Sequence, residues 1–402
     1  MKNWRDIASQ FLKIGATAYG GPAIMGVMQA ELQEKRQWVS KERFVEGLSL
    51  VNMLPGATAA QLSIFLGYAR GGWWGGLLGG LCFVLPGFCV LLVLTMGYAA
   101  LGVTPILRGA LYGLGPVVVG IYLVAVYRLG KAAMSTRSQA LIAIAAAVAA
   151  LASPLGVAGI LLLAGGAGIW LFHSRKLGVP VLVPLAACLA VVHIVARSTS
   201  VPGVVAAPGD PPAATLLQVG AFLLKVGALT FGGGLTMIAF MQEQVVSQFH
   251  WLTPQEFIDG LALGQFTPGP ILMVAAYVGY KVAGVAGAVI GGAAAFLPSF
   301  VMMLAILPAL DRIRKLMWTR AALRGIAPAV IGVLAVSLIR LAPYAVPDVL
   351  ALATLTATAL VLMVWRVATF KVMLGGAILG IARSRLFVLP GAKAVLSTVT
   401  RA

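Results

Sequence analysis

Two lysines interrupt long apolar stretches about 212 residues apart, and a pair of glycines follows each at the same spacing. Lys13 precedes Tyr19-Gly20-Gly21-Pro22, and Lys225 precedes Phe231-Gly232-Gly233-Gly234. An ionisable side chain within a membrane segment costs about 2.5–3.5 kcal/mol on insertion scales, so it usually has a function. Adjacent glycines break a helix, and Pro22 suits the first turn of a new one. The free N–H groups and positive dipole end of that new helix would form an anion site.

A structural interpretation of the same residues is that the lysines reach the membrane interface and the glycines only allow close helix packing. The occurrence of two copies in register favours the functional interpretation.

A second pair of motifs places a polar amide three residues before Pro-Gly. Asn52 precedes Pro55-Gly56, and Gln265 precedes Pro268-Gly269. Proline removes a backbone donor and glycine permits a turn, so we expect a discontinuous helix at both places. The amides could donate to an oxyanion, with Gln61 as a further donor, although such amides often only bond a neighbouring helix. The predicted substrate-binding residues are Lys13, Gly20, Gly21, Asn52, Pro55, Gly56, Gln61, Lys225, Gly232, Gly233, Gln265, Thr267, Pro268 and Gly269.

Other charged residues recur near the ends of the apolar segments. Arg70 and Lys281 are interpreted as interface anchors first and as substrate attractors second. Glu31 and Glu243 close the first segment of each half. They are candidate proton carriers, but we expect each to form a salt bridge with a nearby base.

The match between the two stretches extends far beyond these motifs and keeps its register. Equivalent pairs are Trp38 and Trp251, Gly67 and Gly279, Pro86 and Pro298, Gly113 and Gly325, and Arg128 and Arg340. A long repeat of glycines, prolines and a lysine in apolar sequence indicates a duplicated membrane transporter.

The composition excludes a soluble protein. Hydrophobic residues make up 60% of the 402 residues and charged residues only 10%, against roughly 25% charged residues in an ordinary globular domain. The net charge of +18 comes mainly from a shortage of acidic residues, of which there are 11. Basic loops explain most of this excess, and no basic domain suggests nucleic acid as a partner. The lipid bilayer is therefore the expected surrounding, and few carboxylates suit a translocated anion.

Hydropathy predicts an all-α polytopic membrane protein with about 10–13 membrane segments, several of them broken or re-entrant. Residues 1–197 form the first repeat and 215–402 the second. A Pro/Gly/Ser-rich linker at 198–214 joins them. The apolar segment 180–196 has no partner in the second half.

Loop charges predict the orientation of the two halves. Basic clusters at 128–137 and 173–176 should be cytoplasmic, which also places the N-terminus inside. Counting segments then puts the loop at 104–108 outside and its equivalent at 311–320 inside. Equivalent loops on opposite faces indicate an inverted repeat, for which segment 180–196 supplies the odd span. The C-terminal basic residues would lie outside, against this rule.

The sequence contains no pattern typical of catalysis, a metal site or a cofactor. Cys82, Cys89 and Cys188 lie in apolar stretches, and the three histidines have no metal-ligand spacing. There is no P-loop, no Gly-x-Ser-x-Gly with partners and no His-Glu-x-x-His. We therefore predict neither an enzyme nor ATP hydrolysis.

The glycine and Pro-Gly motifs, with Gly67-Tyr68 and the second copies of all three, resemble the chromate ion transporter family in its long, two-domain form. The resemblance covers both halves. Two departures are Tyr19, where the family usually has phenylalanine, and Gly234, where it has proline.

This resemblance implies a bacterial inner-membrane exporter of chromate, driven by the proton motive force and conferring chromate resistance, with sulfate as a competing analogue. A carrier of sulfate or another tetrahedral oxyanion, with the same architecture, is the main alternative. A non-transporting membrane scaffold or a lipid-modifying enzyme is a remote one. A homodimer is left open.

Overall fold

The computed structural model describes residues 4–19, 21–101, 104–152, 155–173, 216–231, 234–309, 317–365 and 367–388. Within these ranges the chain is helical and contains no strand, which confirms the predicted all-α class. The predicted linker 198–214 and the apolar segment 180–196 lie outside the described residues.

The α-helices follow one another in the same order in the two halves, and the second half contains additional short η elements. The first half consists of α1 (Trp4–Thr17), α2 (Gly21–Met28), η1 (Gln29–Lys35), α3 (Lys41–Met53), α4 (Thr58–Leu101), α5 (Pro105–Ala133), α6 (Arg137–Ala152) and α7 (Val157–Phe172). The second half consists of α9 (Leu216–Ala228), α10 (Thr236–Met241), η2 (Gln242–Gln248), α11 (Pro254–Phe266), η3 (Ile271–Met273), α12 (Val274–Ile306), η4 (Leu307–Ala309), α14 (Met317–Ala345), α15 (Val349–Leu360), η5 (Val361–Trp365) and α16 (Thr369–Val388).

Several helices begin where the sequence supplies a capping side chain. Ser40 and Thr253, at equivalent positions, accept hydrogen bonds from backbone N–H groups in the first turns of α3 and α11. Thr104 caps α5 and Asp348 caps α15 in the same way. Such caps satisfy backbone donors that a helix start leaves unpaired.

Each Pro-Gly motif forms the tip of a short helical hairpin. In the first half α3 ends at Met53 and α4 begins at Thr58. The chain turns back between these helices, as the contact of Gly47 in α3 with the ring of Phe65 in α4 shows. Gly260 of α11 lies against the ring of Tyr277 in α12 in the same manner. These pairs are the re-entrant segments that the sequence predicts.

Both α4 and α12 contain a second sharp turn. Gly72 and Gly284 have φ of +67° and +63°, a conformation in which glycine carries no Cβ penalty. The backbones on either side then pack together, with Gly67 against Gly75 and Gly279 against Gly287. Small residues at these positions allow the two arms of each helix to pack closely. Each long helix is therefore a short arm followed by a long one, at 73–101 in α4 and at 285–306 in α12.

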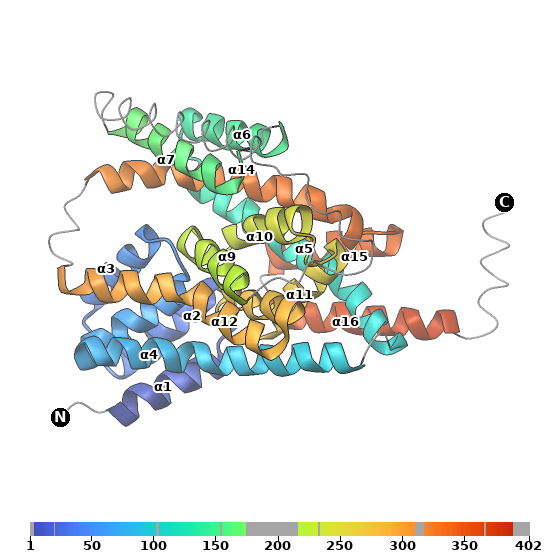
Figure 1. Ribbon diagram of the computed structural model, residues 1–402, viewed down its shortest axis with the longest axis horizontal. Coiled ribbons are helices and arrows are strands. Elements are labelled where there is room, and N and C mark those ends of the chain that lie inside the picture. Colours follow the sequence, from blue (N-terminus) through green and yellow to red (C-terminus); the bar gives the residue numbers. More distant parts are fainter. Residues whose placement is uncertain are drawn as a thin grey trace.

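The long arms of α4 and α12 pack against each other in opposite directions. Gly80 lies against the ring of Phe300, and Gly292 lies against the ring of Phe88. In Figure 1 the long arm of α4 runs toward the start of α5, whereas the long arm of α12 runs the opposite way. Equivalent helices that cross a membrane in opposite directions form an inverted repeat.

Each half is completed by helices of the other half. The helix α5 packs against α15 and α16, and its equivalent α14 packs against α6 and α7. Gly113 of α5 lies against the Gly376 carbonyl, while the equivalent Gly325 lies against the Ala164 carbonyl.

Two equivalent arginines also form contacts between the halves. Arg128 of α5 donates to the Leu362 carbonyl at 2.5 Å, and the equivalent Arg340 of α14 donates to the Ala150 carbonyl at 2.8 Å. Both acceptors lie near the C-terminal ends of short helices, where carbonyls lack intrahelical donors. A single pseudo-two-fold relation therefore accounts for both contacts.

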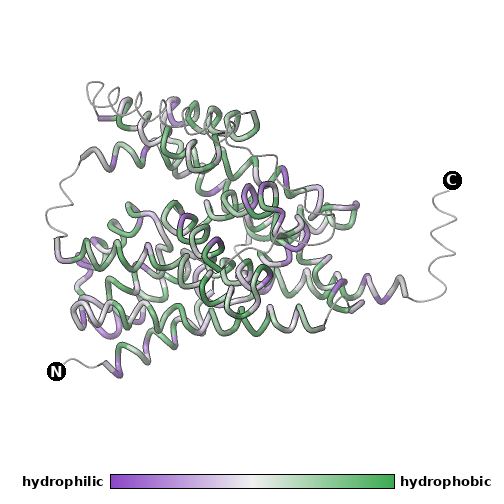
Figure 2. Tube along the Cα trace, viewed as in Figure 1, coloured by the Kyte–Doolittle hydropathy of each residue, from purple (hydrophilic) through white to green (hydrophobic). Residues whose placement is uncertain are grey.

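Most helices are apolar along much of their length, as the residue hydropathy in Figure 2 shows. Large side chains such as Leu81, Leu85 and Val93 on α4 are more than half exposed at 53%, 52% and 67%. In the described part of the chain four helices are long and apolar enough to cross a bilayer. An exposed apolar surface of this kind requires lipid as its solvent, and the molecule is a multi-pass membrane protein.

Candidate functional site

The two Pro-Gly tips are joined to the glycine breaks of the opposite half. The N–H of Gly56 donates to the Thr230 carbonyl at 2.6 Å, and the N–H of Gly269 donates to the Ala18 carbonyl at 3.0 Å. Ala18 and Thr230 follow the ends of α1 and α9, directly before the breaks. The tips and breaks named by the sequence motifs therefore meet in space as two equivalent pairs.

Both tips lie near the middle of the long arms. Ala57 donates its N–H to Ser299 Oγ at 3.0 Å on the α12 arm, and Pro268 lies against Gly87 on the α4 arm. The packing of Gly80 on Phe300 places Ser299 level with position 81 of α4. Positions 81 and 87 are six residues apart, or roughly 9 Å at 1.5 Å per residue. Measured along the arms, the tips are thus offset by about 5 Å to either side of the pseudo-two-fold axis.

Glycine is required at both tips. Gly56 and Gly269 have φ of +124° and +98°, where other residues are strained. A Cβ on Gly56 would in addition overlap Ser299 Oγ and Gln61 Nε2. The backbone and these two polar side chains form a tight first-half tip.

The polar side chains at the tips are held by short contacts. Gln61 is buried and donates Nε2 to the Pro55 carbonyl at 2.7 Å, while its Oε1 has no partner within the described residues. Gln265 donates to the Tyr122 hydroxyl at 3.0 Å. Thr267 donates to the Leu263 carbonyl at 2.8 Å. Asn52 lies on α3 with its side chain exposed, so the two amides at this position have different surroundings.

The breaks that follow α1 and α9 lie where the glycine pairs predict them. In the first half α2 begins at Gly21, with Pro22 in its first turn. Gly20, Gly232 and Gly233 lie outside the described residues. Four helix starts, those of α2, α4, α10 and η3, therefore follow motifs that meet at the middle of the molecule. Helix N-termini present free N–H groups, which favour an anion.

Lys13 and Lys225 do not lie at the tips. Both are exposed on α1 and α9, on the turn before each break. Lys13 interacts electrostatically with Glu31, and Lys225 interacts in the same way with Glu243. The structure thus places both lysines on the outer surface, one turn before the ends of α1 and α9.

The two equivalent glutamates differ. Glu31 pairs with Lys35 at 3.1 Å and with Arg36 at 3.6 Å, as the sequence predicts. The hydrogen bond from Lys35 holds the pKa of Glu31 below its usual value. Glu243 instead accepts a hydrogen bond from the Val157 N–H at the start of α7, at 2.8 Å. Its predicted salt bridge is absent from the described part of the chain.

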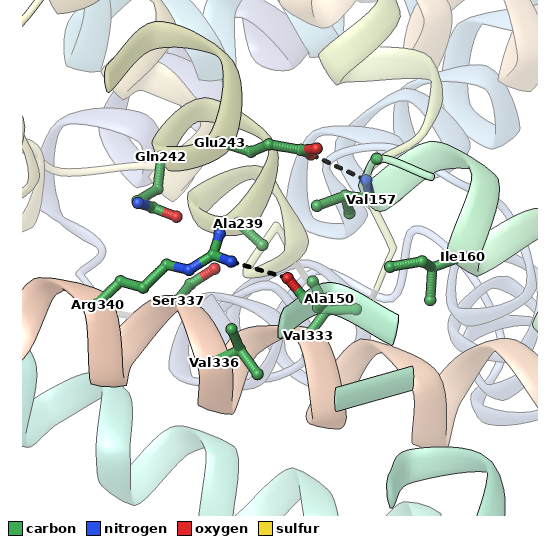
Figure 3. A pocket seen from close by; sticks show the side chains of 11 residues that line it. Ala150, Val157, Ile160, Ala239, Gln242, Glu243, Val333, Val336, Ser337 and Arg340 are labelled. Carbon is green, nitrogen blue, oxygen red and sulfur yellow. Dashed lines mark hydrogen bonds between the residues drawn. The ribbon is translucent and has the colours of Figure 1, made fainter. Parts of the chain in front are cut away.

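Glu243 lies beside a small polar cavity between α7, α14 and the α10–η2 segment (Figure 3). Arg340 reaches across it to the Ala150 carbonyl, and Gln242 lies on the same side as Glu243. The cavity measures about 20 Å³, which is room for about one water molecule. It is too small for a tetrahedral oxyanion.

A much larger cavity of about 580 Å³ opens where α4 ends and α5 and α11 begin. Its wall contains Asp259, whose carboxylate accepts from the Tyr98 hydroxyl at 3.1 Å and from Gln255 Nε2 at 3.2 Å. Lys281 and Glu256 form an ion pair of 2.7 Å in the same wall. The sequence suggests that Lys281 is an interface anchor. The structure shows in addition that it forms an ion pair with Glu256.

The sequence motifs do not identify this cavity, because its charged and hydroxyl residues come from five separated helices. The polar lining residues are Tyr98, Arg108, Tyr112, Thr253, Gln255, Glu256, Asp259, Lys281 and Tyr344. Asp259 lies about two turns of α11 before Thr267, the residue that follows the end of this helix, roughly 12 Å at 1.5 Å per residue. The helix α11 therefore connects the cavity with the second tip. No cluster of metal ligands occurs among the described residues.

Comparison with known proteins gives this geometry a family. The chromate transporter family model matches residues 5–170 and 217–381. The chain belongs to the chromate transporter family. The two matched stretches correspond to the two structural halves.

Relatives with assigned names support this membership. The chain is 31% identical to the chromate transport protein of Cupriavidus metallidurans, over 94% of this chain and 92% of the relative. It is 33% identical to the chromate transport protein of Pseudomonas aeruginosa, over 85% and 81%. It is also 33% identical to a probable chromate transport protein of Synechococcus elongatus, over 76% and 75%. No solved structure matches the chain.

Proposed function

We propose that the protein exports chromate from the cytoplasm across the bacterial inner membrane, driven by the proton motive force, and so confers chromate resistance. The N-terminus is cytoplasmic in this proposal. The observation that carries it is the meeting of two Pro-Gly tips and two glycine breaks near the pseudo-two-fold axis, in a chain of this family. Inverted-repeat transporters bind substrate near the midplane at such discontinuous helices.

The donor set suits a tetrahedral dianion. Helix starts at the middle of the molecule supply backbone N–H groups, and the amides of Gln61 and Gln265 lie beside them. Lys13 and Lys225 attract the anion from the approach. Asn52, Thr267 and the glycines of the breaks complete the proposed binding set.

The membrane potential alone favours this direction of transport. One charge crossing 100 mV changes free energy by about 2.3 kcal/mol. When a dianion leaves a cytoplasm that is electrically negative, its free energy therefore falls by roughly twice that amount. Export of chromate needs no ATP hydrolysis, and no catalytic step is proposed.

The test is expression of the full chain in a chromate-sensitive bacterium that lacks its own exporter. Cells with the protein should accumulate less chromate than cells without it, and collapse of the proton motive force should remove the difference. Equal accumulation in both strains would refute the proposal.

A sulfate or other oxyanion carrier is the second candidate, because charge and backbone donors discriminate poorly between chromate and sulfate. Competition in inverted vesicles separates the two. Excess chromate should suppress uptake of labelled chromate more strongly than equal sulfate, molybdate or phosphate. Stronger suppression by sulfate would favour the second candidate.

A further inference from the structure

The two halves treat their equivalent carboxylates differently. In the first half Glu46 pairs with Arg43 at 2.9 Å, and Glu31 pairs with Lys35 and Arg36. The repeat aligns Glu46 with Asp259. Within the described residues no cation lies within ion-pair distance of Asp259. This position is therefore acidic in both halves, but among the described residues only the first-half carboxylate forms an ion pair.

Asp259 is bonded by groups that can serve either protonation state. It is only 5% exposed, and its partners are a tyrosine hydroxyl and a glutamine amide. Both partners can donate to a carboxylate, and both can accept from a carboxylic acid after a rotation of the hydroxyl or amide. A lysine or arginine partner can only donate and would hold the ionised form.

Most of the other charged groups around Asp259 are paired with each other. Glu256 on the same helix is neutralised by Lys281 of α12. From α5, Arg108 lines the cavity, and Tyr112 donates to Asp348, which Arg383 of α16 also binds at 2.7 Å. Tyr98 of α4 and Tyr344 of α14 complete the wall, and Tyr277 behind it donates to the Glu256 carbonyl at 2.9 Å. Asp259 is the carboxylate of this wall that lacks a cationic partner within the described residues.

Asp259 lies between the large cavity and the proposed substrate site. The side chain borders the 580 Å³ cavity, and the same helix ends at the second Pro-Gly tip. The cavity opens on the face where α5 begins, which the predicted topology places outside. A proton that enters from outside would thus meet Asp259 before any group at the tip.

We propose that Asp259 is the proton carrier that couples proton entry to chromate export. The side chain takes a proton from water in the cavity and releases it to water on the cytoplasmic side after α11 moves. Only its O–H bond forms and breaks, and one proton moves inward per cycle. This inference rests on the proposed function, but export driven by membrane potential alone could occur without it.

The test uses the full chain in liposomes, with potassium and valinomycin clamping the membrane potential so that only a pH difference drives chromate. The wild type should accumulate chromate against its gradient. Asp259→Asn should abolish this accumulation but retain chromate–chromate exchange, and that exchange should lose its dependence on pH. Asp259→Glu should restore part of the accumulation, because it keeps a titratable group.

Glu46→Gln is the matched control, since it changes the equivalent carboxylate of the first half and should keep both activities. Accumulation by Asp259→Asn driven by the pH difference would overturn the inference. So would loss of exchange as well as accumulation in a folded variant, because that result indicates a substrate-binding role. A wild type driven by potential but not by pH would refute proton coupling and leave export intact. A wild type that moves no chromate would instead refute the proposed function.

Discussion

Lys13 and Lys225 are exposed residues, which limits the effect that either can have in the proposed role of attracting the anion. An exposed charge acts on an anion through solvent and is weakened by salt. We expect Lys13→Ala and Lys225→Ala each to reduce the rate of chromate export by about fivefold at low ionic strength. Lys→Arg should recover part of the rate, because the charge persists.

The measurement is export at equal membrane abundance of each variant. Added salt should reduce the difference between wild type and the alanine variants. A double alanine variant that exports normally would return both lysines to the role of interface anchors.

At the same scale, Gly56 tests whether the tip conformation matters. Gly56→Ala adds a Cβ at a φ of +124° and against two polar side chains. We expect a cost of roughly 1–3 kcal/mol in stability and loss of export. Gly269→Ala has the strained φ of +98° but no atom within 4 Å of the added Cβ, so its effect should be smaller.

Gly26→Ala is the control, because this glycine lies within α2 and its added Cβ would contact nothing within 4 Å. Alanine is favoured over glycine in a helix by about 1 kcal/mol. The expected order of thermal midpoints in detergent is therefore Gly26→Ala highest and Gly56→Ala lowest. Equal midpoints for Gly56→Ala and Gly26→Ala would show that the tip is not constrained.

At the scale of elements, the repeated motifs in the sequence predict where helices break. The glycine pairs and Pro-Gly motifs mark the breaks after α1, α3, α9 and α11, because helix-breaking chemistry is local. Sequence reasoning did not locate the exposed positions of Lys13 and Lys225, since an isolated helix does not show which face it buries. It also missed Asp259, because its partner Tyr98 reaches it only through the packing of α4 on α11, whereas Gln255 lies one turn away on the same helix.

The exchanged helices give an element-scale prediction. Arg128 and Arg340 each bind a carbonyl at the end of a helix in the other half. Removing one such charged hydrogen bond from an exposed site should cost about 1 kcal/mol. Arg128→Ala and Arg340→Ala should lower the thermal midpoint by equal amounts, and the double variant by their sum, because the two sites share no partner. Unequal effects would show that the halves have diverged at these contacts.

At the scale of the whole molecule, the antiparallel arms predict opposite sides for equivalent loops. A reporter fused after Thr104 should report the outside, and one fused after Arg314 the inside. Alkaline phosphatase and a fluorescent protein give complementary signals for these two compartments. Signals from the same side would contradict the inverted repeat.

The exchange of helices between the halves also bears on synthesis. The helix α5 is completed by α15 and α16, which the ribosome makes only after most of the second half. Neither half is then a unit that can mature by itself during translation. A chain divided within 198–214 should be stable only when both pieces are made in the same cell, and each piece alone should be cleared by membrane proteases.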